Sequence, residues 1–242
     1  MAIKPTKLFK GYKFDPATAD ALEEVDKLLP KVKVQPTQGS YNVGGVAASA
    51  GTHDGGGAGD LHARTLDEDD KDQLVYAMRV AGFAAWIRKP SQGPWVEHLH
   101  FVRKDCSDAA PLAKAQVQDY YDGKNGLKGH AKDDGPSVGV GRKQTFSDHM
   151  KRAGTKVYAS HINDAAKHDL DEGKRPALHP NEVYALERAL VREGLLRIEA
   201  LDGTYKQSSR DAFRKYRADN GDLSVADAVK KLGKKHGFPT AE

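Results

Sequence analysis

The chain has 242 residues, of which 38% are hydrophobic and 30% are charged, so it holds enough apolar material for packed cores and is not a wholly disordered polymer. The sequence contains neither an apolar run of about 20 residues, as a membrane span requires, nor the apolar run of a secretory signal in its first thirty residues. The only cysteine is Cys106, which excludes an internal disulfide and a thiolate metal cluster. Any metal is therefore expected to be bound by histidine and carboxylate groups.

Capping residues and apolar periodicity predict the elements of the first half of the chain. Asp15 followed by Pro16 is typical of an N-cap with proline at the first helical position. Thr65 and Glu68 have the spacing of a capping box, which predicts a second helix that ends at Gly82. The expected elements are a helix over 16–29, a strand over 31–36, a helix over 66–82, and two neighbouring strands over 83–87 and 96–102.

The composition changes after Tyr121, because residues 122–142 are rich in glycine and poor in apolar side chains. Beyond this segment, capping residues precede four apolar helical patterns: Ser160, Asn181, Ser208 and Ser224. We therefore predict an α+β fold with an antiparallel-sheet domain over 1–125, a Gly-rich linker over 126–150 and a small all-α domain over 151–242. Residues 205–242 hold nine Lys or Arg and five Asp or Glu, which favours an anionic partner for the C-terminal end.

A short set of histidines and carboxylates carries the chemical signal. His53 and Asp60 lie seven residues apart across a run of Gly and Ala that lets the backbone fold tightly. Glu97, His98 and His100 follow on the second predicted strand, where polar residues are disfavoured unless they have partners. Catalytic zinc needs three protein ligands of these types, an open position and a nearby base. The pattern predicts His53, Asp60 and His100 as ligands, with Glu97 or His98 as the base.

The spacing His-x6-Asp followed by Glu-x-x-His resembles that of the zinc D-alanyl-D-alanine peptidases and their relatives in the Hedgehog and lysostaphin-type zinc fold. Residues 38–41, 52–60, 82–86 and 93–100 are also similar to the catalytic domains of actinobacterial and actinophage wall hydrolases, and the likeness covers most of residues 30–127. The resemblance implies that Zn2+ is bound by His53, Asp60 and His100. It also implies a substrate site formed by Gln38, Ser40, Tyr41 and Trp95.

The resemblance leaves the base and the cleaved bond open. Glu97 corresponds to the base of the dipeptidase-like members, and His98 to that of the lysostaphin-like members. In a regular strand His98 and His100 share one face and Glu97 points the other way. We prefer Glu97, because Pro94 and Trp95 indicate an irregular entry into the strand. Carboxypeptidases of the family carry an arginine near the segment that here contains Gln38, whereas the first arginine of this chain is Arg64. The resemblance therefore predicts either carboxypeptidase or endopeptidase activity.

The C-terminal residues 183–196, 202–205 and 211–216 resemble the peptidoglycan-binding-like helical domain that accompanies such peptidases. Together the resemblances imply a monomeric zinc peptidase that acts on peptidoglycan, as in a phage endolysin. Neither nucleic acid nor a membrane is an expected partner. The protein would be made in the host cytoplasm without a signal peptide and would reach the wall after release. The alternative is a non-catalytic wall-binding or virion structural protein that retains the fold.

Overall fold

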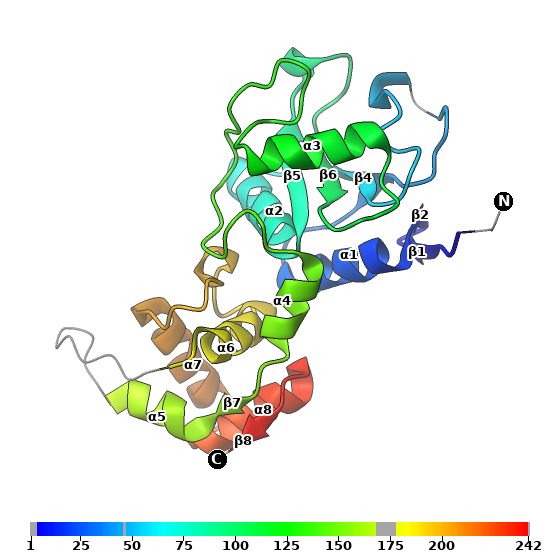
Figure 1. The fold of residues 1–242 in the computed structure, drawn as a ribbon. Helices are drawn as coiled ribbons and strands as arrows, with labels where there is room; N and C mark the ends of the chain where they lie inside the picture. Colours follow the sequence, from blue (N-terminus) through cyan, green and yellow to red (C-terminus); the bar gives the residue numbers. More distant parts are fainter. Residues whose placement is uncertain (1–3, 46, 168–177, 242) are drawn as a thin grey trace. The chain divides into compact units, whose positions relative to one another are not determined.

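The computed structural model describes residues 4–45, 47–167 and 178–241 (Figure 1). These residues form eight α-helices and small β-sheets, so the protein has the mixed α/β character that the sequence predicts. The chain divides into two compact units, Met1–Asp148 and His149–Glu242. Within the described ranges no helix combines the length and the apolar character that a membrane crossing requires.

A four-stranded antiparallel sheet forms the centre of the first unit, with its strands in the order β3-β4-β6-β5. The two neighbouring strands expected from the sequence are β5 and β6, which pair along their whole length. The strand expected over 31–36 begins only at Pro36. The strands of the unit are β1 (Lys7–Phe9) and β2 (Tyr12–Phe14), which form a separate hairpin, and β3 (Pro36–Gln38), β4 (Ala58–His62), β5 (Phe83–Arg88) and β6 (His98–Arg103).

Three helices accompany this sheet: α1 (Pro16–Leu28), α2 (Glu68–Val80) and α3 (Pro111–Tyr121). The predicted cap of α1 is confirmed, because the Asp15 side chain accepts a hydrogen bond from the Thr18 amide. Helix α2 starts later than expected, since Asp67 caps it and Thr65 instead bonds to His62. Helix α3 was not predicted.

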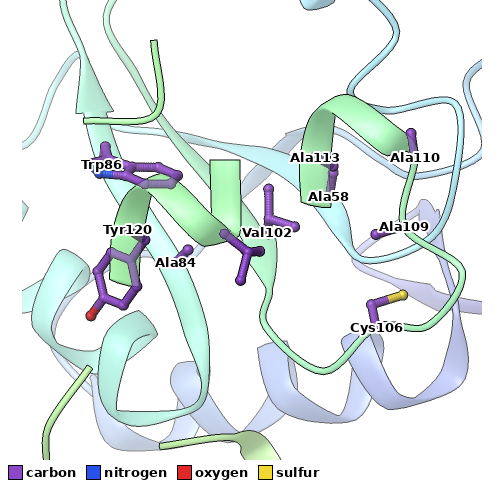
Figure 2. Packing of buried hydrophobic residues seen from close by; sticks show 10 residues of the cluster. Ala58, Ala84, Trp86, Val102, Cys106, Ala109, Ala110, Ala113 and Tyr120 are labelled. Carbon is purple, nitrogen blue, oxygen red and sulfur yellow. The ribbon is translucent and has the colours of Figure 1, made fainter. Parts of the chain in front are cut away.

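Helix α3 covers part of one face of the sheet (Figure 1). Trp86 and Val102 of the sheet belong there to one buried cluster with Val117 and Tyr120 of the helix. Figure 2 shows this cluster, which also contains several small alanines. Because residues that pair across antiparallel strands share a face, His100, the partner of Trp86, lies on this same face. The helix therefore contributes side chains to the surroundings of His100.

The segment expected as a linker over 126–150 differs from that prediction, since residues up to Asp148 belong to the first unit. The Asp133 carboxylate is fully buried and pairs with Arg79 Nη2 at 2.8 Å and with Arg142 Nη1 at 2.7 Å. Arg79 also donates to the Pro136 carbonyl at 2.5 Å. Buried ion pairs and hydrogen bonds, rather than apolar periodicity, fix this glycine-rich segment.

The second unit is mainly helical, and a short parallel strand pair departs from the expected all-α domain. Ser224 and Gly237 bound its last helix as predicted, with Gly237 in the left-handed region at φ 81°. His179, rather than Asn181, caps the helix that begins at Pro180. Part of the helix expected over 161–170 lies outside the described residues. The elements are α4 (Phe146–Ala153), which begins in the first unit, β7 (Val157–Tyr158), α5 (Ala159–Lys167), α6 (Pro180–Arg192), α7 (Gln207–Asp219), α8 (Val225–His236) and β8 (Thr240–Ala241); the short 3-10 helices of the chain include Ala47–Ser49, Pro90–Gln92 and Ile198–Ala200.

Candidate metal centre

The three residues predicted as metal ligands meet at one point of the first unit. Asp60 of β4 and His100 of β6 are direct partners across the antiparallel ladder, so their side chains emerge on the same face. His100 Nδ1 lies 2.8 Å from Asp60 Oδ1, and His53 Nε2 lies 3.5 Å from the same oxygen. All three residues are buried, and one donor atom of each lies within 4.8 Å of the others. Two strands and one glycine-rich loop thus assemble a group that could hold a metal ion.

Hydrogen bonds on the far side of each imidazole orient the two histidines. His53 Nδ1 lies 3.2 Å from the Gly39 carbonyl oxygen, and His100 Nε2 lies 2.9 Å from Gln116 Oε1. The Gln116 amide is itself fixed, because its Nε2 donates to the Gly126 carbonyl at 3.1 Å. Since a carbonyl oxygen only accepts, each ring carries its hydrogen on that outer nitrogen. The other nitrogen of each ring then presents a lone pair to the Asp60 carboxylate, an arrangement that a cation stabilises.

The electrostatics of the group also suit metal binding, which needs a neutral imidazole and an ionised carboxylate. Burial alone would raise the pKa of Asp60, but its close contacts with His100 and His53 outweigh this and hold that pKa well below the ordinary value. Burial lowers the pKa of His100, and the attraction of Asp60 offsets this only in part. At neutral pH Asp60 is therefore an anion and His100 is uncharged.

The group opens onto a cavity of about 890 Å³, which has room for a peptide segment. Both candidate bases line this cavity. His98 shares the face of His100, and its Nε2 lies 3.8 Å from Asp60 Oδ1. Glu97 occupies a bend immediately before β6, as its predicted role requires, and pairs with Lys71 Nζ at 3.0 Å. The geometry therefore keeps both residues within the site.

The predicted substrate residues separate into two pairs. Gln38 and Trp95 line the cavity, and the Trp95 ring packs edge-on against His98 with centroids 6.3 Å apart. Ser40 and Tyr41 do not line it. Ser40 is buried and donates to the Ala58 carbonyl at 2.6 Å, while Tyr41 stands at φ 57° and hydrogen-bonds Asp108 through its hydroxyl. These two side chains fix the loop before the metal centre.

Sequence reasoning missed several residues around the centre. Gln116 orients His100 from α3, which was not predicted, and a lone glutamine carries no recognisable signal. Trp86 stacks on the His100 ring with centroids 6.4 Å apart and planes 12° from parallel. Arg88 follows on the same face of β5 and lines the cavity. The period of two along β5 places both residues on one face, but only the register with β6 shows that this face is that of the metal centre.

Fold and site together define a mixed α/β protein with a buried group of two histidines and one aspartate that could hold a metal ion. Comparison of the chain with protein-family models, curated proteins and solved structures found no match.

Proposed function

We propose that this protein is a zinc-dependent peptidase that hydrolyses the peptide part of bacterial peptidoglycan. The observation that carries the proposal is the convergence of His53, Asp60 and His100 at the wall of a large cavity. Hydrogen bonds to the outer nitrogen of each imidazole orient the two histidines. Two imidazoles and one carboxylate are a ligand set of catalytic zinc, which keeps one further position open for water or substrate. The donor set therefore fits zinc.

His53, Asp60 and His100 would hold the zinc ion, which when bound would supply Lewis-acid polarisation of the scissile carbonyl and of the attacking water. In the proposed reaction Glu97 accepts the proton of that water and passes it to the leaving amine. The ion pair with Lys71 at 3.0 Å holds the Glu97 carboxylate in place. His98 is the alternative base, because its Nε2 already faces the centre. Trp95 bounds the cavity beside these groups and offers an apolar surface to a bound peptide.

The choice of peptidoglycan rests on the sequence resemblance to wall hydrolases over residues 30–127 and to the peptidoglycan-binding-like domain further along. The basic excess of residues 205–242 is compatible with an anionic wall polymer. We propose a phage endolysin as the biological setting. The bond that is hydrolysed lies either in the wall cross-link or at the end of the stem peptide.

The ion pair of Glu97 favours one other candidate function. A carboxylate that is already paired with Lys71 at 3.0 Å is less available to accept a proton. This contact suits a wall-binding or virion structural protein that retains the fold and the metal group without turnover.

A wall-clearing assay separates the two functions. Activity on purified wall that is lost with chelator and restored with zinc supports the peptidase, whereas inactivity at every stage supports the non-catalytic protein. Mass spectrometry of the released muropeptides identifies the cleaved bond from the new termini.

Substitution of the base tests the mechanism. Glu97→Gln is expected to keep zinc bound and to lower turnover by about 10²- to 10⁴-fold, the usual contribution of a general base. Glu68→Gln is the matched control, because Glu68 pairs with the same Lys71 at 2.7 Å but is 85% exposed. A fully active Glu97→Gln variant would transfer the role of base to His98.

A further inference from the structure

Charged side chains line the cavity in two groups that differ in their partners. The carboxylates are all engaged: Asp60 by the metal-centre histidines, Glu97 by Lys71, and Asp119 by His130 Nδ1 at 2.8 Å. The cations lining the cavity are Arg64, Arg88 and Lys128. Within residues 4–45, 47–167 and 178–241, none of these cations has a carboxylate within 4.0 Å. The unsatisfied charge of the cavity is therefore positive.

Arg88 is the deepest of the three cations. It lies opposite His98 in the ladder of β5 and β6, on the face of the metal centre, and only 3% of its surface is exposed. Its Nη1 donates to the Asn125 carbonyl at 2.6 Å, and its guanidinium lies 4.9 Å from the centroid of the Trp86 ring. Its Nη2 is buried and makes no hydrogen bond within the described part of the chain.

A buried cation without a carboxylate in direct contact is unfavourable, and buried charges in proteins are normally paired and hydrogen-bonded. Burial lowers the pKa of Arg88 to about 10, and the attraction of the more distant Asp60, Asp133 and Asp134 offsets this only in part, so the group is still protonated at neutral pH. Gly126 packs beside the guanidinium, where a Cβ would lie 3.3 Å from Arg88 Nη2, so any larger residue there would crowd that nitrogen. Arg88 is positively charged, lines the cavity, and has an Nη2 without a hydrogen-bond partner in the described part of the chain. These three properties match an incoming anion.

We propose that Arg88 is the anion-recognition residue of this cavity and that it pairs through Nη2 with a carboxylate of the bound peptide. Arg64 and Lys128 strengthen the attraction of that anion from elsewhere on the cavity wall. Arginine suits the task because its guanidinium remains charged when buried and binds carboxylates through directed hydrogen bonds. The role of Arg88 rests on the proposed peptidase function, because that function makes the ligand a peptide.

In a wall stem peptide the carboxylate has two sources: the C-terminus and the free α-carboxyl of a γ-linked D-glutamate. Four N-acetylated L-Ala-γ-D-Glu-L-Lys-D-Ala-D-Ala peptides separate them, with neither, either or both groups converted to the amide. Binding to the full-length chain is measured by isothermal titration calorimetry in the presence of chelator. Neither turnover nor the attraction of a metal for carboxylates then contributes, so the result is independent of whether the protein is a peptidase.

The wild-type chain is expected to bind the peptide with both carboxylates at least about tenfold more tightly than the doubly amidated one, as for a charge-assisted hydrogen bond. Arg88→Met is expected to bring this ratio to about one, and Arg88→Lys to retain part of it, because lysine keeps the charge without the planar fork. Lys31→Met, which removes an exposed charge away from the cavity, should leave the ratio unchanged. The singly amidated peptides identify the carboxylate that Arg88 binds.

A purely structural role for Arg88 predicts a different pattern. Loss of its contacts with Asn125 and Trp86 would weaken all four peptides equally and preserve the ratio. That result would overturn the proposal, as would a wild-type ratio of one or the absence of measurable binding. Far-UV circular dichroism checks the fold of each variant. If Arg88→Met fails to fold, the wild-type ratio and Arg88→Lys still decide, because an unchanged ratio in the lysine variant would contradict recognition by the guanidinium fork.

Discussion

Gln116 offers the sharpest test of the metal centre, because it contacts His100 without being a ligand. In Gln116→Leu the Nε2–H of the buried His100 loses the acceptor that lies at 2.9 Å. An unsatisfied buried donor costs about 1–3 kcal/mol, and the ring is also free to reverse its tautomer. We therefore expect zinc affinity to fall by about 10- to 100-fold, the range found when such orienting contacts are removed. Competition with a chromophoric chelator at neutral pH measures the change.

Gln118→Leu is the matched control for this substitution. Gln118 belongs to the same helix but is exposed, and its side-chain amide donates to Asp122 at 3.0 Å. Its loss should leave zinc affinity unchanged. Equal zinc affinities of Gln116→Leu and the wild type would show that the glutamine does not orient His100, and the argument from the outer hydrogen bonds would then fail.

Two further predictions concern stability. Burial raises the pKa of Glu187 in the folded protein to about 8, from 4.5, although Ser209 donates to it at 2.6 Å. The unfolded chain therefore loses this proton first as pH rises, and the carboxyl's contribution to stability, complete below about pH 4.5, falls by up to about 5 kcal/mol by pH 8. Glu187→Gln should gain stability over the wild type across that interval in urea unfolding followed by circular dichroism, and a pH-independent difference would contradict this. Gly59→Ala would place a Cβ 2.5 Å from the Phe101 ring and should cost about 1–3 kcal/mol, whereas Gly129→Ala, with nothing within 4 Å, should be neutral in thermal unfolding.

The sequence predicted the parts of this fold that depend on local chemistry. Asp15 and Ser224 act as caps where their spacing indicated, because a cap uses only its neighbours along the chain. His53, Asp60 and His100 could be predicted as metal ligands because polar side chains in a strand are disfavoured unless they have partners, and a metal ion is such a partner. The structure brings their donor atoms within 4.8 Å of one another. The identity of the metal and the reaction stay predictions.

The features that escaped prediction depend on contacts between distant residues. Asp133 lies in a glycine-rich segment with the composition of a linker, yet Arg79, fifty-four residues earlier, anchors it inside the first unit. Ser40 and Tyr41 belong to a motif that resembles a substrate loop, but tertiary contacts turn them into supports of that loop. Arg88 needs the register of β5 and β6 before its position near His98 becomes visible.

The pairing of Asp60 with His100 across one ladder has a consequence for how the protein can diversify. Both side chains keep their relative position for as long as the two strands keep their register, and a slip of one residue would turn either side chain to the opposite face. The segment over 89–97, by contrast, is a connection outside the strands and brings Trp95 and Glu97 to the cavity. Insertions and exchanges there can alter which peptide is held while leaving the metal ligands undisturbed. Chemistry and selectivity are thus encoded in separable parts of the chain.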